Sequence, residues 1–231
     1  MKILAAVVCA VVFVAAFRRP LKRIPLLFYA GAGLLDIALL YSYSYAMPAV
    51  VWEYLLVFVQ KCMFAQAILM IVMFTGVLKD GSRLKRSLLP IRGELSVFAA
   101  ILVLGHAVPH LPFLSRVLGH MSAVPPNRAV SFLIAAALLV LLAVLTVTSF
   151  HVVRKRMDPG RWKRLQRLAY PFFLLTYVHL LLVLLDPALA GSGTAIVSIA
   201  TYTVLFSAYV LLRLMRAAAD RTIVRITGSP A

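Results

Sequence analysis

The sequence alternates between long apolar runs and short basic segments. Seven apolar runs are recognised, at about 3–17, 24–46, 51–78, 95–114, 129–153, 168–186 and 193–215. A helix needs about 20 apolar residues to cross a bilayer, so the first run is marginal and the third is long enough to tilt. The chain is therefore expected to be an all-α, polytopic membrane helix bundle with about seven transmembrane helices.

Composition excludes a water-soluble domain, because 63% of the residues are hydrophobic, only 13% are charged, and the mean hydropathy is +0.99. The net charge of +17 lies in short clusters between the apolar runs, as topology signals do, so nucleic acid is not an expected partner. Cys9 and Cys62 both fall inside apolar runs, which leaves no disulfide framework and no CxxC motif.

The distribution of basic residues predicts the orientation. Twenty of the 24 Lys and Arg follow the first, third, fifth and seventh runs. Short loops rich in Lys and Arg stay in the cytoplasm, so the N-terminus is expected outside and the C-terminus inside a cell inner (cytoplasmic) membrane. The first run is expected to be an uncleaved anchor, with a signal peptide as the alternative, since RRPLKR follows it directly and would resist translocation.

Two histidines are predicted at the same depth in the bilayer. His106 lies 12 residues beyond Glu94 and His179 lies 12 residues beyond Arg167, both counted from the cytoplasmic side. At helical rise each imidazole is about 18 Å up its helix. Two neutral imidazoles facing across a bundle can serve as the axial ligands of one haem iron, which suits electron transfer. The alternative is that each histidine hydrogen-bonds a neighbouring helix.

The stretch from Thr148 to His179 carries a motif. It has a Thr-Ser pair at the end of one apolar run, a basic loop with Arg161-Trp162, and then Leu165, Tyr170 and His179. This pattern resembles the ferric reductase-like transmembrane family and, within it, the haem-binding membrane subunits that partner periplasmic methionine sulfoxide reductases. The resemblance covers about residues 90–215. The apolar runs predict a single transmembrane domain over 1–231, with three N-terminal helices in 1–90 and a short cytoplasmic tail in 216–231, and the resemblance implies that the four-helix portion in 91–215 binds haem.

Two positions depart from the family pattern. Members with two stacked haems carry a second histidine about 13 residues before each ligand, where this chain has Gly93 and Gln166. The resemblance therefore implies one b-type haem, held in the outer half of the membrane by His106 and His179 as iron ligands.

Further cofactor-binding candidates are His110, one turn beyond His106 and an alternative ligand, and His151, for an inner haem, hydrogen bonding or a quinone. Arg116 and Arg128 are candidates for contacting haem propionates, with plain surface charges as the alternative.

Two charges are predicted deep inside apolar runs. Asp36 and Lys61 are both predicted near the middle of the bilayer, at about 18 Å and 15 Å from opposite ends of their runs. An ion pair between adjacent helices is the favoured interpretation, since unpaired charges there are costly. The alternative is a proton path that uses Asp36.

These features predict a haem-b electron-transfer subunit of an oxidoreductase system, with no catalytic residue of its own. The tail after Met215 is too short to hold a flavin or nicotinamide, so FMN or FAD is expected only on a partner. Electrons are expected from the quinol pool or a cytoplasmic flavoprotein, and the expected acceptor is an extracytoplasmic redox partner or a metal ion. Membrane lipids are the other expected contact. The alternative is a haem-free transporter, or an assembly or scaffold protein that retains the fold.

Overall fold

The chain is helical throughout the part that the structure describes. The computed structural model describes residues 2–45, 48–52, 57–119 and 124–227, and these ranges contain no β-strand. Within them, six segments are long and apolar enough to cross a membrane: Ile3–Arg23, Pro25–Ser42, Arg83–Gly119, Pro126–Ser149, Pro159–Leu189 and Gly193–Ala219. The prediction of an all-α membrane protein with several apolar helices is confirmed.

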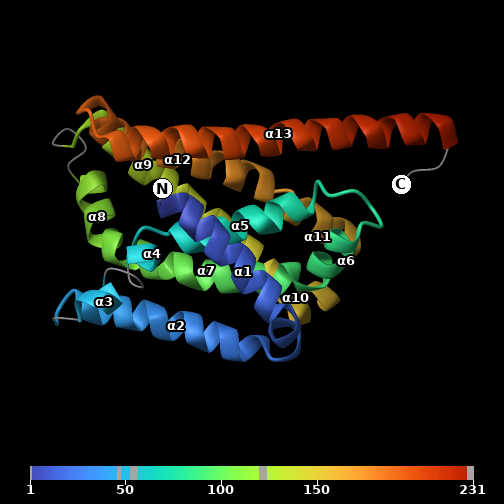
Figure 1. Cartoon of the computed structure of the whole chain (residues 1–231), viewed down its shortest axis with the longest axis horizontal. Coiled ribbons are helices and arrows are strands. Elements are labelled where there is room, and N and C mark those ends of the chain that lie inside the picture. Colours follow the sequence, from blue (N-terminus) through green and yellow to red (C-terminus); the bar gives the residue numbers. More distant parts are fainter. Residues whose placement is uncertain (1, 46–47, 53–56, 120–123, 228–231) are drawn as a thin grey trace.

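The helices follow one another with short connections (Figure 1). In chain order they are α1 (Lys2–Arg23), α2 (Pro25–Ser42), α3 (Ala49–Val51), α4 (Val57–Gln60), α5 (Met63–Thr75), α6 (Arg83–Leu88), η2 (Leu89–Ile91), α7 (Arg92–Ala107), η3 (Val108–His110), α8 (Leu111–Gly119), α9 (Pro126–Ser149), α10 (His151–Arg156), α11 (Pro159–Gln166), α12 (Ala169–Leu189) and α13 (Gly193–Thr227). Proline at the first turn of α2, α9 and α11 suits a position where no helical N–H bond is lost.

The third apolar run, 51–78, does not form one long helix. Helix α4 ends at Gln60, the chain turns at Lys61 and Cys62, and α5 begins at Met63. Cys62 has φ 55°, in the left-handed region that a non-glycine residue seldom adopts. At 13 residues, α5 is about 20 Å long, shorter than the hydrocarbon core of a bilayer. The expected full-length third span is therefore replaced by a short buried helix.

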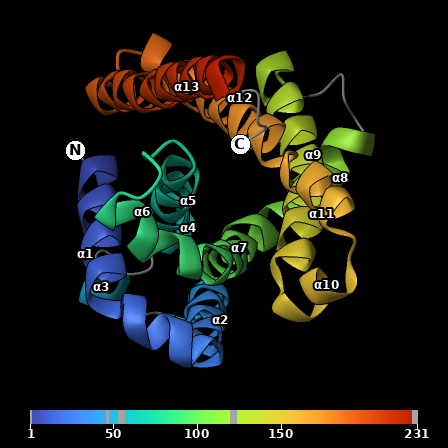
Figure 2. The ribbon, with the colours of Figure 1, turned by 90° about the vertical axis from the view of Figure 1, so that its right-hand side faces the viewer.

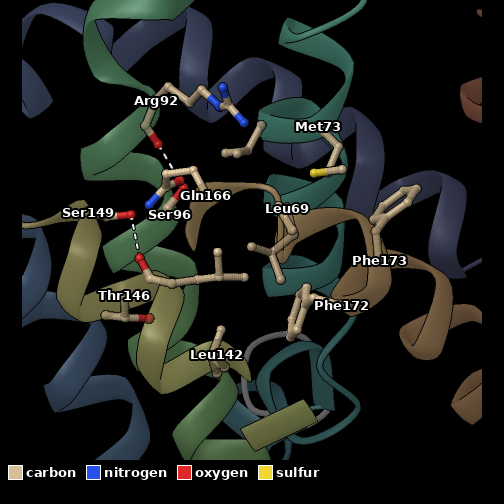
Figure 3. Close-up of a pocket in the computed structure, with 13 residues that line it drawn as sticks. Leu69, Met73, Arg92, Ser96, Leu142, Thr146, Ser149, Gln166, Phe172 and Phe173 are labelled. Carbon is tan, nitrogen blue, oxygen red and sulfur yellow. Dashed lines mark hydrogen bonds between the residues drawn. The ribbon is translucent and has the colours of Figure 1, made fainter. Parts of the chain in front are cut away.

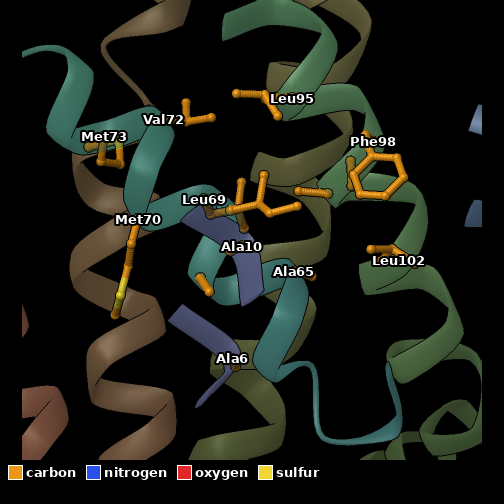
Figure 4. Packing of buried hydrophobic residues seen from close by; sticks show 14 of the residues in the cluster. Ala6, Ala10, Ala65, Leu69, Met70, Val72, Met73, Leu95, Phe98 and Leu102 are labelled. Carbon is orange, nitrogen blue, oxygen red and sulfur yellow. The ribbon is translucent and has the colours of Figure 1, made fainter. Parts of the chain in front are cut away.

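The core lies where α1 crosses α5 and α7 (Figure 4). Ala6 and Ala10 of α1 are fully buried and four residues apart, so they face the same way and let α1 approach α5 closely. The rings of Phe13 on α1 and Phe98 on α7 stack with their centroids 5.1 Å apart. Small residues of α1 and larger residues of α7 thus both pack against α5.

Helix α7 stands between two groups of helices (Figure 2). Helices α1, α2 and α5 lie on one side of α7, and α9 with α12 lies on the other. Helix α13 packs on α12. There the ring centroids of Phe173 and Phe206 are 4.3 Å apart, and the Tyr177 hydroxyl lies 2.8 Å from Thr203 Oγ1. Both groups therefore place side chains against α7, which carries His106.

The two ends of the bundle differ in charge. We call the end that carries α6, α10 and α11 the basic end; it lies on the right of Figure 1. There Asp80 forms ion pairs with Lys85 (2.6 Å) and with Arg216 of α13. The carboxylate thus connects the loop before α6 with the last helix.

We predict that α1 depends on its small buried residues. Replacing Ala6 with Leu should lower stability by about 1–3 kcal/mol, because the added atoms have no space between α1 and α5. Ala5→Leu is the matched control, since Ala5 is exposed on the same helix. Thermal unfolding in detergent, followed by the loss of monodisperse protein, measures both variants. Equal melting temperatures would contradict the packing described for α1.

Candidate functional site

His106 lies in the last turn of α7 and is held by a backbone carbonyl. Its Nδ1 atom is 2.5 Å from the carbonyl oxygen of Gln60, the last residue of α4. The turn at Lys61 and Cys62 interrupts the helix there and leaves this carbonyl available. Because a carbonyl only accepts hydrogen bonds, Nδ1 of His106 carries the proton.

His179 lies in the middle of α12 and is held in the same way by α9. Its Nδ1 atom is 2.9 Å from the hydroxyl oxygen and 3.1 Å from the carbonyl oxygen of Ser131, a buried residue. Because the Ser131 carbonyl can only accept a hydrogen bond, Nδ1 of His179 carries the proton. In both histidines the other ring nitrogen, Nε2, therefore keeps its lone pair and has no hydrogen bond within the described residues.

The two histidines belong to one neighbourhood. Both side chains are half-buried, and the charged forms of His106, His110 and His179 would repel one another at their separation. Helices α7 and α12 both pack on α9, which brings the two rings to a common region of the bundle. The structure thus brings together the two residues predicted as iron ligands.

His110 follows His106 by one turn, as its spacing predicts. Its Nδ1 is 2.9 Å from the His106 carbonyl oxygen, and the ring centroids are 5.0 Å apart. The short 3-10 helix η3 carries it past Pro109, and its side chain is exposed. His110 is therefore more accessible than His106, and its Nδ1 is also engaged with a backbone carbonyl.

The remaining predicted site residues lie elsewhere. His151 is the first residue of α10 and is exposed, because α9 ends at Ser149 and Phe150 turns the chain with ψ 132°. Arg116 is exposed in the last turn of α8.

Arg128 forms an ion pair with Asp186, a partner that the sequence does not predict. Its Nε lies 3.3 Å from Asp186 Oδ2, and Asn127 donates to the other oxygen of the same carboxylate at 2.6 Å. Asp186 lies near the end of α12, 59 positions from Asn127, and only the fold brings the two together. The candidate role of Arg128 with a haem propionate therefore competes with this ion pair.

The predicted ion pair between Asp36 and Lys61 is wrong. Lys61 is exposed in the turn before α5, whereas Asp36 of α2 is only 8% exposed and its Oδ1 has no hydrogen-bond partner within the described residues. The carboxylate lies directly against Gly105 of α7, where any side chain would collide with it. Asp36 therefore sits beside the residue that precedes His106, unpaired with Lys61.

The motif from Thr148 to Gln166 forms a hydrogen-bonded hairpin at the basic end. Gln166 donates from Nε2 to Thr148 Oγ1 at 2.9 Å, and the Trp162 indole donates to the Thr148 carbonyl at 2.9 Å. The Arg154 guanidinium lies over the Trp162 ring, 4.5 Å from its centroid. Asp158 accepts from the Arg161 backbone and caps α11. These contacts explain the motif as a structural clamp between α9 and α11.

A cavity of about 40 Å³ lies at the basic end, beside the hairpin (Figure 3). Gln166 is part of its wall, and Gly93 is adjacent in sequence to the lining residue Arg92. At Gly93, α7 comes close to the Ser149 carbonyl of α9. The cavity wall contains Leu69, Val72, Met73, Arg92, Ser96, Leu142, Leu145, Thr146, Ser149, Gln166, Ala169, Phe172 and Phe173.

Comparisons with known proteins give one informative match. No protein-family model and no solved structure matches the chain. A protein of Treponema pallidum (strain Nichols), described as an uncharacterized protein, is 37% identical over 232 residues. The match covers 96% of this chain but only 62% of the treponemal protein, so the chain spans less than two thirds of that relative.

We predict that Gly105 sets the contact between α2 and the His106 region. Gly105→Ala should destabilise the protein by about 1–3 kcal/mol, because the new methyl group collides with Asp36. Gly33→Ala on α2 is the control, since no atom lies within 4 Å of its added carbon. Thermal stability in detergent measures both, and a destabilised Gly33 variant beside an unchanged Gly105 variant would contradict this geometry.

Proposed function

We propose that this chain is a b-type haem membrane protein that passes electrons to an extracytoplasmic acceptor as a subunit of an oxidoreductase system. One observation supports the proposal: His106 and His179 make the same kind of hydrogen bond. In each, Nδ1 is bonded to a backbone carbonyl and Nε2 has no hydrogen-bond partner within the described residues. A histidine that ligates a metal commonly donates its other ring N–H to such a group, which fixes the ring and raises its basicity.

The donor set fits a haem. Among the described residues, no three His, Cys, Asp or Glu side chains gather closely enough to hold a metal ion by themselves. A haem needs only two protein ligands, because the porphyrin supplies four nitrogens, and His106 and His179 would hold its iron. When bound, a haem supplies a one-electron ferric–ferrous couple. The residues of this chain would supply the two ligands and hold their rings in orientation through the Gln60 and Ser131 contacts.

The resemblance to the ferric reductase-like transmembrane family agrees with this function. The Thr148 to His179 motif has its matching positions, and its hydrogen bonds hold α11, the helix before α12, against α9. Helix α12 carries His179 and α9 carries Ser131. The family's second pair of histidines is replaced by Gly93 and Gln166. We therefore propose one haem per chain.

We also propose that the chain crosses the inner membrane seven times, with its N-terminus outside. Gln60 contacts Tyr43 near the end of α2, and Asp80 contacts Arg216 at the basic end, so residues 60–80 connect opposite ends of the bundle. Although α5 is short, this segment then acts as the missing third crossing. The basic end would face the cytoplasm, as the distribution of Lys and Arg favours.

The second candidate is a haem-free transporter, or an assembly or scaffold protein with the same fold. Asp36 favours the transporter, because a buried carboxylate oxygen without a partner is costly in a membrane and commonly marks a transport path. This candidate predicts loss of function on Asp36→Asn and no effect of His179→Ala.

We predict that His106→Ala and His179→Ala each lose nearly all bound haem, because each removes one axial ligand. The visible absorption of the purified variants, normalised to protein, measures haem content. His151→Ala is the matched control and should keep its haem, since that residue is exposed on α10. Asp36→Asn should also keep it. Retention of haem in both ligand variants, with correct folding, would sink the ligand assignment.

A further inference from the structure

Asp36 is a buried acid that the proposed haem site does not use. Its side chain is 8% exposed, its Oδ1 has no hydrogen-bond partner, and it forms no ion pair within the described residues. The groups that interact with the carboxylate are the Gly105 backbone and the Cys62 thiol, and neither carries a positive charge. An ionised carboxylate away from water is costly without a countercharge. Asp36 is therefore stable as an ion only beside a positive charge, and otherwise it binds a proton.

The position of Asp36 places it beside the proposed iron ligand. Helix α2 packs along α7 (Figure 2), and at Gly105 the two helices come so close that an added methyl group would collide with Oδ1, Cγ and Cβ of Asp36. Gly105 directly precedes His106. Charges in a buried region are screened much less than charges at the surface. A change of charge at the iron bound to His106 would therefore act strongly on Asp36.

Few other groups in this region can take up a proton. Helices α1, α4 and α7 pack on α2, and the only other carboxylic acid among their described residues is Glu94. Glu94 lies eleven residues before Gly105, about 16 Å away along α7. The other titratable or charged groups on these helices and beside them are Cys9, Arg18, Arg19, Lys22, Arg23, Tyr29, Tyr41, Lys61, Cys62, Arg92, His106 and His110.

Most of these groups are of types that do not exchange a proton near neutral pH. Cysteine, tyrosine, lysine and arginine ordinarily ionise at higher pH. His106 uses Nδ1 for the Gln60 carbonyl, and its Nε2 is assigned to the iron. His110 is exposed, and imidazole is the one other type here that titrates near neutral pH. Glu53 lies outside the described residues. Asp36 is thus the acid best placed to respond to the iron, with His110 as the group to be separated from it.

The proposed haem supplies the countercharge that Asp36 lacks. A ferric haem iron carries one positive charge more than a ferrous one, and the change is a single electron. Asp36 is then best matched as a carboxylate beside the oxidised site and as a neutral acid beside the reduced site. Such coupling is reciprocal, so a proton on Asp36 favours the reduced state by the same free energy with which reduction favours the proton.

We propose that Asp36 is a proton-binding site linked to the redox state of the haem. On reduction the carboxylate takes up one proton from water and forms one O–H bond, while one electron converts ferric to ferrous iron; oxidation reverses both changes. The electron comes from the donor of the proposed function, or from dithionite in a test. This inference rests on the proposed function, and it gives Asp36 a role beside the haem instead of in a transport path.

The first test is a potentiometric titration of the haem in the full chain, in lipid nanodiscs, at a series of pH values. The midpoint potential should fall as the pH rises, by up to about 59 mV for each tenfold fall in proton concentration, the value for one proton per electron. Asp36→Asn should keep its haem and lose most of this dependence, because an amide does not ionise. Glu94→Gln removes the other acid and is the matched control, which should keep the dependence.

A second measurement needs no variant. The infrared difference spectrum between reduced and oxidised protein should show the C=O band of a protonated carboxylic acid on reduction. Labelling the protein with ¹³C-aspartate should move this band to lower frequency. The label does not enter the haem propionates, Glu94 or His110, so it separates their protonation from that of an aspartate. The band should also be missing in Asp36→Asn.

The outcomes separate this inference from the proposed function. A bound haem whose potential depends equally on pH in the unaltered chain and in Asp36→Asn would overturn the inference and leave the haem assignment standing. A reduced protein without a band that responds to the aspartate label would do the same, and this result decides the matter if Asp36→Asn folds poorly. A protein that binds no haem would instead refute the proposed function, and the inference with it.

Discussion

Inside a bilayer a backbone polar group without a hydrogen-bond partner is costly, and this cost helps to explain how both histidines are held. The turn at Lys61 and Cys62 interrupts a helix in an apolar region and frees the Gln60 carbonyl. The Nδ1–H of His106 donates a hydrogen bond to that carbonyl, and the Nδ1–H of His179 donates to the carbonyl of Ser131 in the same way. The backbone thereby fixes both imidazoles, and the nitrogen left free on each is the one that an iron would require. A break that costs helix length in α5 thus contributes directly to the candidate site.

The polar groups near the histidines and those at the basic end find their partners in different ways. Near the histidines, polar atoms are paired with backbone while two ring nitrogens remain open. At the basic end, Gln166 and Trp162 both donate to Thr148 and close the hairpin, and the half-buried Arg92 lies in the wall of a cavity. The motif from Thr148 to Gln166 therefore forms a clamp at the basic end, and Gln166 contributes to it because its amide donates to Thr148.

Much of the architecture was predictable from the sequence because it depends on local composition. Six of the seven apolar runs correspond to helices long enough to span a membrane, and the equal spacing of His106 and His179 from basic segments anticipated their shared neighbourhood. The break after Gln60 was not predictable, since the run from 51 to 78 stays apolar through it and only Lys61 hints at a turn. Partners distant in sequence were also missed: Asp36 packs on Gly105 instead of pairing with Lys61, and Asp186 binds Asn127 and Arg128. Charge alone cannot identify such partners, because the fold decides which helices lie side by side.

The central claim is that His106 and His179 together ligate one haem. The most direct measurement is a dithionite-reduced minus air-oxidised absorption spectrum of the purified full chain, with a pyridine haemochrome assay to count haem, after expression with added haem precursor. The account predicts the sharp bands of a six-coordinate b-type haem, at about one haem per chain. A colourless protein under those conditions would contradict it and leave the buried Asp36 as the better guide to function.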